Sequence, residues 1–172
     1  FLNFKKKYED HNLENLKPIN PSRITAEAAI SLITNQLKDT INIGIIGLGS
    51  IGFRIARELY EQNINLNIYS KNKEVTSKKI EYLKLINTNL MTADIQLLDN
   101  ISQICEKSDL VFTCSSQDKI LTENNLSKIN NIPNEIIDIG KNNLTIEAIN
   151  FCIKNNIKIS TLDIGNQLIK EI

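Results

Sequence analysis

The chain has 172 residues, of which 41% are hydrophobic, enough for one domain with a core of ordinary size. Its 20 basic and 20 acidic residues cancel, and its few aromatic residues offer no platform for stacking bases, which argues against nucleic acid or a membrane surface as a partner. Three widely spaced cysteines and one histidine argue against a disulfide framework or a zinc site, and no apolar run is long enough to cross a bilayer. We therefore expect a globular, cytoplasmic protein without a metal.

The first segment of the chain carries the expectations about domain organisation. The sequence begins at Phe1 without a Met, so we expect a piece of a longer polypeptide. Residues 1–24, which include Pro21, predict an irregular lead-in, and residues 25–172 predict a single domain. Apolar residues at helical spacing predict that this domain opens with a helix over residues 25–38.

From residue 41 onward, strand and helix patterns alternate along the chain. Short apolar runs are typical of buried parallel strands, and apolar residues three or four apart are typical of helices. The expected strands are 41–46, 65–69, 94–98, 109–114, 135–139 and 157–163, and the expected helices are 50–62, 74–86, 100–107, 121–129 and 145–155. Because parallel neighbours need crossover connections, this alternation predicts an α/β fold with a doubly wound parallel sheet of about six strands.

Three glycines with GxGxxG spacing follow the first strand directly and open the next helix. Gly47 permits a tight turn, Gly49 lets backbone amides approach an anion closely, and Gly52 lets the helix lie close to the sheet. Glycine turns also join strands to helices in proteins that bind nothing, but the buried strand before this turn and the amphipathic helix after it favour a dinucleotide site. The residues expected to hold the pyrophosphate are Gly47, Leu48, Gly49, Ser50, Ile51 and Gly52.

The end of the second strand is the place where such sites select their cofactor. NAD sites usually carry an Asp or Glu there, about 20 residues after the glycines, which binds the ribose hydroxyls. This chain has Ser70, Lys71, Asn72 and Lys73 instead, and the first carboxylate is Glu74. A hydroxyl donor and lysine ammonium groups suit a 2′-phosphate, so NADP is predicted rather than NAD. The alternative is that both lysines are ordinary solvated loop residues.

Two further loops are expected to reach the same site, because ligands of such sheets lie at the carboxyl ends of the strands. The loop after the fourth strand is expected to pass over the adenine side or the bridging phosphates, and the loop after the fifth strand is expected to lie near the nicotinamide. The residues expected to contact the dinucleotide there are Cys114, Ser115, Ser116 and Gly140. The charged residues of the loops are expected to be solvated, so no catalytic residue is assigned. These residues are Asp118, Lys119 and Lys141.

The order of the motifs resembles a known cofactor domain. A helix just before the first strand, then GLGSIG, YSK, SDLVFTCSS and IIDIG, resembles the NADP-binding Rossmann domain shared by glutamyl-tRNA reductase, shikimate dehydrogenase and methylenetetrahydrofolate dehydrogenase. The resemblance spans residues 25–168. It implies that Ser70 and Lys71 meet the 2′-phosphate and that Gly140 lies beside the nicotinamide. It also implies that much of the catalytic apparatus belongs to another domain.

A second resemblance is to the cofactor domain of D-2-hydroxyacid dehydrogenases, through GIIGLGSIG, SDLVFTC and IIDIGKNNLTIEAI. In that case Lys141 would stand where those enzymes carry a substrate-binding Arg. The chain departs from this family in the close spacing of the first helix, in the missing acid at Ser70, and in having no Glu or His motif after Asp163.

The sequence therefore predicts the NADP-binding domain of an oxidoreductase, a dehydrogenase or reductase that transfers hydride to or from a small cytosolic metabolite. The expected partners are that small-molecule substrate and either an adjoining substrate domain or a second copy of the chain. The alternative is a regulatory module that senses a nucleotide without catalysis, because no convincing proton donor lies in the chain.

Overall fold

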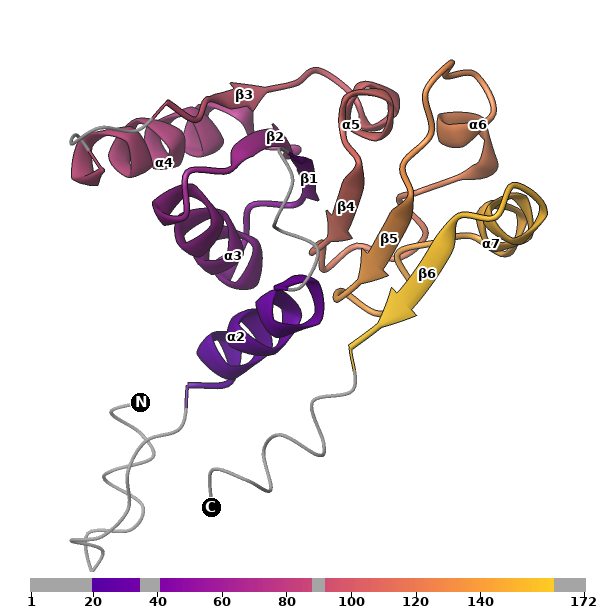
Figure 1. Ribbon diagram of the computed structural model, residues 1–172, viewed down its shortest axis with the longest axis horizontal. Coiled ribbons are helices and arrows are strands. Elements are labelled where there is room, and N and C mark those ends of the chain that lie inside the picture. Colours follow the sequence, from indigo (N-terminus) through magenta and orange to yellow (C-terminus); the bar gives the residue numbers. More distant parts are fainter. Residues whose placement is uncertain (1–19, 35–40, 88–91, 163–172) are drawn as a thin grey trace, which may run out of the picture.

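The computed structural model describes residues 20–34, 41–87 and 92–162. In this part of the chain the strands are β1 (Asn42–Ile46), β2 (Asn65–Tyr69), β3 (Ile95–Leu97), β4 (Leu110–Thr113), β5 (Glu135–Asp138) and β6 (Lys158–Thr161). They form one sheet in the order β3-β2-β1-β4-β5-β6, and every neighbouring pair is parallel (Figure 1). The predicted doubly wound α/β sheet is thus confirmed. The chain moves outward from β1 to β3 and then outward again from β4 to β6, so the strand order reverses between β1 and β4.

Helices cover both faces of this sheet. In the described residues they are α2 (Pro21–Ile33), α3 (Ser50–Glu61), α4 (Lys73–Ile86), α5 (Ile101–Lys107), α6 (Glu123–Leu126) and α7 (Ile146–Lys154). One hydrophobic cluster joins α2, α3 and α4 to one face of the sheet, and a second cluster joins α5, α6 and α7 to the other (Figure 1). None of the described helices is both long and apolar enough to span a membrane.

The sequence of β1 reflects its position in the middle of the sheet, where both faces are covered. Ile43 and Ile45 are fully buried on the face of α3, and Ile46 is buried on the opposite face. Gly44 lies under α5, and a Cβ added to it would stand 2.6 Å from the Cγ2 atom of Ile104. This glycine is therefore required because α5 packs directly on β1, and no local sequence pattern indicates that requirement.

Two helices differ from the sequence prediction, and the expected end of the first one, at residue 38, lies outside the described residues. The first helix begins at Pro21 and not at residue 25, because the side chain of Asn20 caps it and proline fits the first helical position, where its missing N–H is no loss. The expected lead-in is therefore wrong for residues 21–24, and its remainder up to residue 19 lies outside the described residues. The helix expected over residues 121–129 is reduced to the four residues of α6. Its start moves to Glu123 because the residue at 121 pairs with Leu144 in a β-bridge, and it ends at Leu126.

Candidate functional site

A cavity of about 960 Å³ opens at the carboxyl ends of the strands, beside the reversal of strand order between β1 and β4. Its walls are the glycine turn after β1 and the loops after β2, β4 and β5, and α2 adds Ser22 at the edge. A crevice in this position is the usual ligand site of an open parallel sheet.

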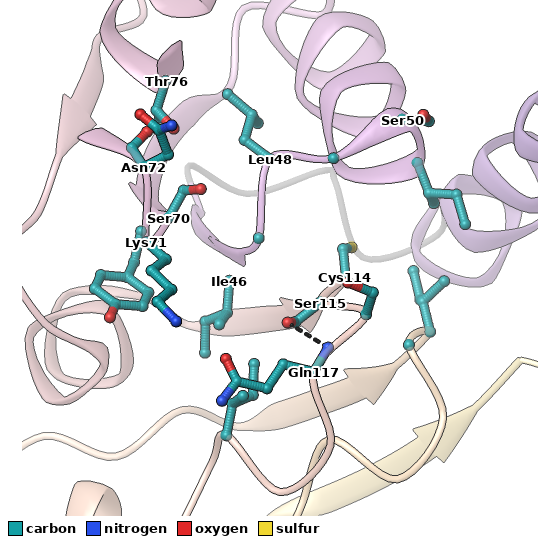
Figure 2. Close-up of a pocket in the computed structure, with 18 of the residues that line it drawn as sticks. Ile46, Leu48, Ser50, Ser70, Lys71, Asn72, Thr76, Cys114, Ser115 and Gln117 are labelled. Carbon is teal, nitrogen blue, oxygen red and sulfur yellow. Dashed lines mark hydrogen bonds between the residues drawn. The ribbon is translucent and has the colours of Figure 1, made fainter. Parts of the chain in front are cut away.

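Two groups of polar side chains face each other across the cavity. Figure 2 shows Ser70, Lys71 and Asn72, from the loop after β2, on one side. Ser115 and Gln117, from the loop after β4, lie on the other side, where the Gln117 backbone N–H donates to the Ser115 hydroxyl at 3.0 Å. The glycine turn lines the cavity between these groups, so a ligand that reaches both sides passes the turn.

Each glycine position of the turn has a different structural reason for lacking a side chain. Gly47 has a φ of +99°, a backbone conformation that residues with a side chain rarely adopt. Its N–H donates to the carbonyl oxygen of Tyr69 at 2.8 Å. A Cβ on Gly52 would collide with the carbonyl oxygen of Gly47. Gly49 is the N-cap of α3, where no side chain caps the helix and no atom lies within 4 Å of an added Cβ. The first turn of α3 therefore presents uncapped amides beside open space, which is how helix N-termini bind phosphate groups.

In the described part of the chain, the charged side chains that line the cavity are all positive. Lys71, Lys79 and Lys119 line it, and no Asp or Glu among the described residues does. Lys79 reaches from α4 and donates from Nζ to the carbonyl oxygen of Leu48 at 2.6 Å, which ties that helix to the glycine turn. This cavity therefore favours an anionic ligand and offers nothing that would repel an additional phosphate.

Most of the residues predicted for the site lie together on the cavity wall. The exceptions are Gly52, which packs behind the turn, and Lys73, whose ammonium group bonds to the exposed Asp99 carboxylate and lowers its pKa. Of the three loop charges expected to be solvated, Lys119 lines the cavity and the other two do not. The predicted residues on the wall are Gly47, Leu48, Gly49, Ser50, Ile51, Ser70, Lys71, Asn72, Cys114, Ser115, Ser116 and Gly140.

Three residues that matter to the site are missed by sequence reasoning. Ser22 lies in the segment that the sequence assigns to the lead-in, and Lys79 is one lysine among many on an amphipathic helix. Asn143 is fully buried behind the cavity wall, where its side chain bonds to the loop after β4. None of these gives a local signal, because each acts on a segment far away in the sequence.

The cavity wall contains few groups suited to proton transfer at neutral pH. Within the described residues no histidine or carboxylate lines it, and no group of three or more His, Cys, Asp and Glu side chains could hold a metal ion. Burial, with a smaller effect of the nearby Asp138 carboxylate, raises the pKa of the Cys114 thiol far above its usual range. This thiol is therefore protonated at neutral pH and is not an activated nucleophile.

The strand order, the glycine turn and the cationic cavity together define a nucleotide-binding Rossmann domain of the kind found in dehydrogenases. Residues 42–160 match the family model for the NAD binding domain of 6-phosphogluconate dehydrogenase, and the chain belongs to this family. No curated protein sequence matches the chain.

Solved structures share this fold at low sequence identity. Dipicolinate synthase from Bacillus halodurans matches with a TM-score of 0.63 and 19% identity over 82% of this chain and 45% of its own. L-tryptophan dehydrogenase from Nostoc punctiforme matches with a TM-score of 0.61 and 19% identity over 82% of this chain and 42% of its own. D-lactate dehydrogenase from Escherichia coli matches with a TM-score of 0.61 and 16% identity over 84% of this chain and 51% of its own.

These matches bear on the two resemblances drawn from the sequence. The chain spans about half the length of these proteins, and identities below 20% establish the shared fold alone. A structure described as a D-isomer specific 2-hydroxyacid dehydrogenase, from Polaromonas, also matches, with a TM-score of 0.54 and 13% identity over 82% of this chain and 51% of its own. The second resemblance thus has structural neighbours, and the resemblance to the glutamyl-tRNA reductase group stays a prediction.

Proposed function

We propose that the chain is the NADP(H)-binding domain of an oxidoreductase that transfers hydride to or from a small metabolite. The observation that carries this proposal is the charge of the cavity beside the glycine turn. Three lysines line it, Ser70 follows β2, and no carboxylate of the described residues faces the place where an NAD site carries one. A ligand with a pyrophosphate and a 2′-phosphate matches this distribution better than one with a pyrophosphate alone.

The residues of the cavity fit the cofactor group by group. The amides at the start of α3 would hold the pyrophosphate, because Gly49 leaves the approach open and no side chain caps the helix. Ser70 would donate a hydrogen bond to the 2′-phosphate, and Lys71 would supply positive charge. The bound cofactor supplies the hydride chemistry, and this chain binds and orients it.

A further domain or a second copy of the chain would complete the enzyme. Hydride transfer to a carbonyl group needs a proton donor, and the described part of the cavity offers lysines, a tyrosine and a protonated thiol but no histidine or carboxylate. The matching part of this chain covers only 45% of the dipicolinate synthase chain and 51% of the D-lactate dehydrogenase chain. We therefore propose an adjoining substrate domain, or a homodimer, as the partner that contributes this group. Three free cysteines favour a reducing cytoplasm as its location.

A regulatory module that binds the nucleotide without catalysis is the second candidate. The same lack of a proton donor on the described cavity wall favours it. The two candidates differ in the presence of the donor: with its substrate domain or second copy and an oxidised metabolite that accepts the hydride, an enzyme oxidises NADPH, and a sensor does not.

Calorimetric titration of the chain with NADPH, NADH, NADP⁺ and NAD⁺ tests the proposal. We expect NADPH to bind at least about tenfold more tightly than NADH, because about 1.4 kcal/mol of extra phosphate contact is enough for that ratio. Lys71→Ala should reduce the preference for NADPH over NADH. Lys78→Ala should leave this preference unchanged, because the exposed Lys78 pairs with Glu74 on α4 and does not line the cavity. Absence of binding by all four nucleotides at millimolar concentration would refute the proposal.

A further inference from the structure

One buried side chain holds together the two loops that form the cavity wall opposite the end of β2. The amide oxygen of Asn143 accepts a hydrogen bond from the backbone N–H of Ser115 at 3.2 Å. Its amide nitrogen donates to the carbonyl oxygens of Ser115 at 3.1 Å and of Gln117 at 2.9 Å. Asn143 has no exposed surface, so three of the four hydrogen bonds open to its amide fix the loop after β4.

The backbone of Asn143 is anchored in turn to the strands beneath it. Its N–H donates to Oδ2 of Asp138 at 3.2 Å, and Oδ1 of Asp138 accepts from the Thr113 hydroxyl at 2.8 Å. The carbonyl oxygen of Asn143 accepts from the N–H of Leu121 at 2.9 Å, which joins the two loops a second time. The position of Asn143 is thus fixed relative to the carboxyl ends of both β4 and β5.

Two glycines allow the neighbouring loops to approach the main chain of Ser115 closely. A Cβ on Gly140 would collide with the Asn143 side chain and with the carbonyl oxygen of Ser115. A Cβ on Gly47 would stand 3.0 Å from the nitrogen of Ser115. The main chain of Ser115 therefore lies between the glycine turn and the Asn143 amide. We therefore expect a change at Asn143 to move the wall that faces the turn.

We infer that Asn143 is a positioning residue for the half of the dinucleotide that carries the nicotinamide, an inference that rests on the proposed function. In sheets of this type the two halves of the ligand lie on opposite sides of the strand reversal. Under the proposed function Ser70 and Lys71 face the adenosine half, and the wall from Ser115 to Gln117 lies across the cavity from them, where the nicotinamide half would lie. This position differs from the adenine side or bridging phosphates that the sequence predicts for the loop. Asn143 does not line the cavity and acts through this wall.

Two ligands separate this role from a general effect on folding. Wild type and Asn143→Ala are titrated with NADPH and with 2′,5′-ADP, which carries the adenosine half and the 2′-phosphate but no nicotinamide. We expect the Kd of NADPH to rise about tenfold or more, the effect of losing a contact the size of one hydrogen bond, and the Kd of 2′,5′-ADP to change less than about twofold. Asn143→Ser keeps a polar side chain but is too short to make all three side-chain hydrogen bonds, and should give the same pattern if Asn143→Ala does not fold.

Asn67 provides a matched control in another part of the fold. Its buried amide donates to the carbonyl oxygen of Lys107 at 2.9 Å and to the Ser108 hydroxyl at 3.1 Å, and it does not line the cavity. Asn67→Ala should lower the melting temperature and leave both Kd values unchanged. Equal weakening of both ligands in folded Asn143→Ala, or unchanged NADPH affinity, would overturn the inference. If wild type binds neither ligand, the proposed function is refuted and the inference falls with it.

Discussion

Replacing Ser70 with Asp should reverse the choice between NADP and NAD. Ser70 is half-buried at the end of β2, where it lines the cavity beside Lys71. The nearest carboxylate along the chain, Glu74, is paired with Lys78 at 2.8 Å, so an aspartate at position 70 would be the first acid on this part of the wall. The new carboxylate would face the 2′-phosphate of NADP but could accept a hydrogen bond from the 2′-hydroxyl of NAD.

The size of the effect follows from the charges and from the lost hydrogen bond. A phosphate monoester carries about 1.5 to 2 negative charges at pH 7, and two unit charges 4 Å apart interact by about 1 kcal/mol in water and about 4 kcal/mol near a protein surface. Because the cavity is open to solvent, we take about 2 kcal/mol for the repulsion and add about 1 kcal/mol for the lost hydroxyl donor. The affinity for NADPH should then fall by about two orders of magnitude.

Calorimetric titration of wild type and Ser70→Asp with NADPH and NADH measures this change directly. Ser127→Asp introduces the same charge at an exposed serine after α6, away from the cavity, and should leave both affinities unchanged. If folded Ser70→Asp keeps the selectivity of wild type, the electrostatic argument is wrong and the 2′ position lies elsewhere. An equal shift in Ser127→Asp would point to net charge and not to the site.

Three further predictions concern the packing of the glycine turn, its role in binding, and the pH dependence of stability. Gly52→Ala should destabilise the fold by about 3 kcal/mol or more, because its Cβ would collide with a backbone oxygen that cannot move freely, and urea denaturation measures the loss. Gly49→Ala, whose Cβ meets no protein atom within 4 Å, should keep stability within about 1 kcal/mol of wild type yet weaken dinucleotide binding in the calorimeter. Burial raises the pKa of the Cys105 thiol to about 12, above its value of about 8.5 in an unfolded chain. The contribution of this thiol to the free energy of unfolding should therefore be complete below about pH 8.5 and disappear as the pH rises toward 12. Urea denaturation at several pH values should show a smaller fall in the free energy of unfolding over this range for Cys105→Ala than for wild type.

The strands and helices could be predicted from the sequence because their signals are local. Apolar runs identified all strands of the described sheet to within about two residues, an accuracy typical of such boundaries. The predicted start of the first helix is wrong because Pro21 by itself indicates irregular structure, whereas the preceding asparagine caps a helix there. The error at α6 arose because a bridge to Leu144, which is distant in the chain, replaces the first turn of the expected helix.

The candidate site was predictable only where its residues follow strands. The turn from Gly47 to Ile51 and the loop after β2 lie on the cavity because the carboxyl ends of parallel strands meet at one edge of a sheet. Lys79 enters the site from α4 and Ser22 from α2, through the packing of helices whose mutual position the sequence does not state.

By itself, the amino-acid sequence determined the alternation of strands and helices and the conformation of the glycine turn, because both depend on side chains and backbone angles within a few residues. The tertiary structure alone decided that Lys79 would bond to that turn, that Gly44 must be bare to admit α5, and that Asn143 would lock the wall at Ser115. These contacts join residues that are tens of positions apart in the chain, and their partners are selected by how the helices pack on the sheet and by which strands lie side by side.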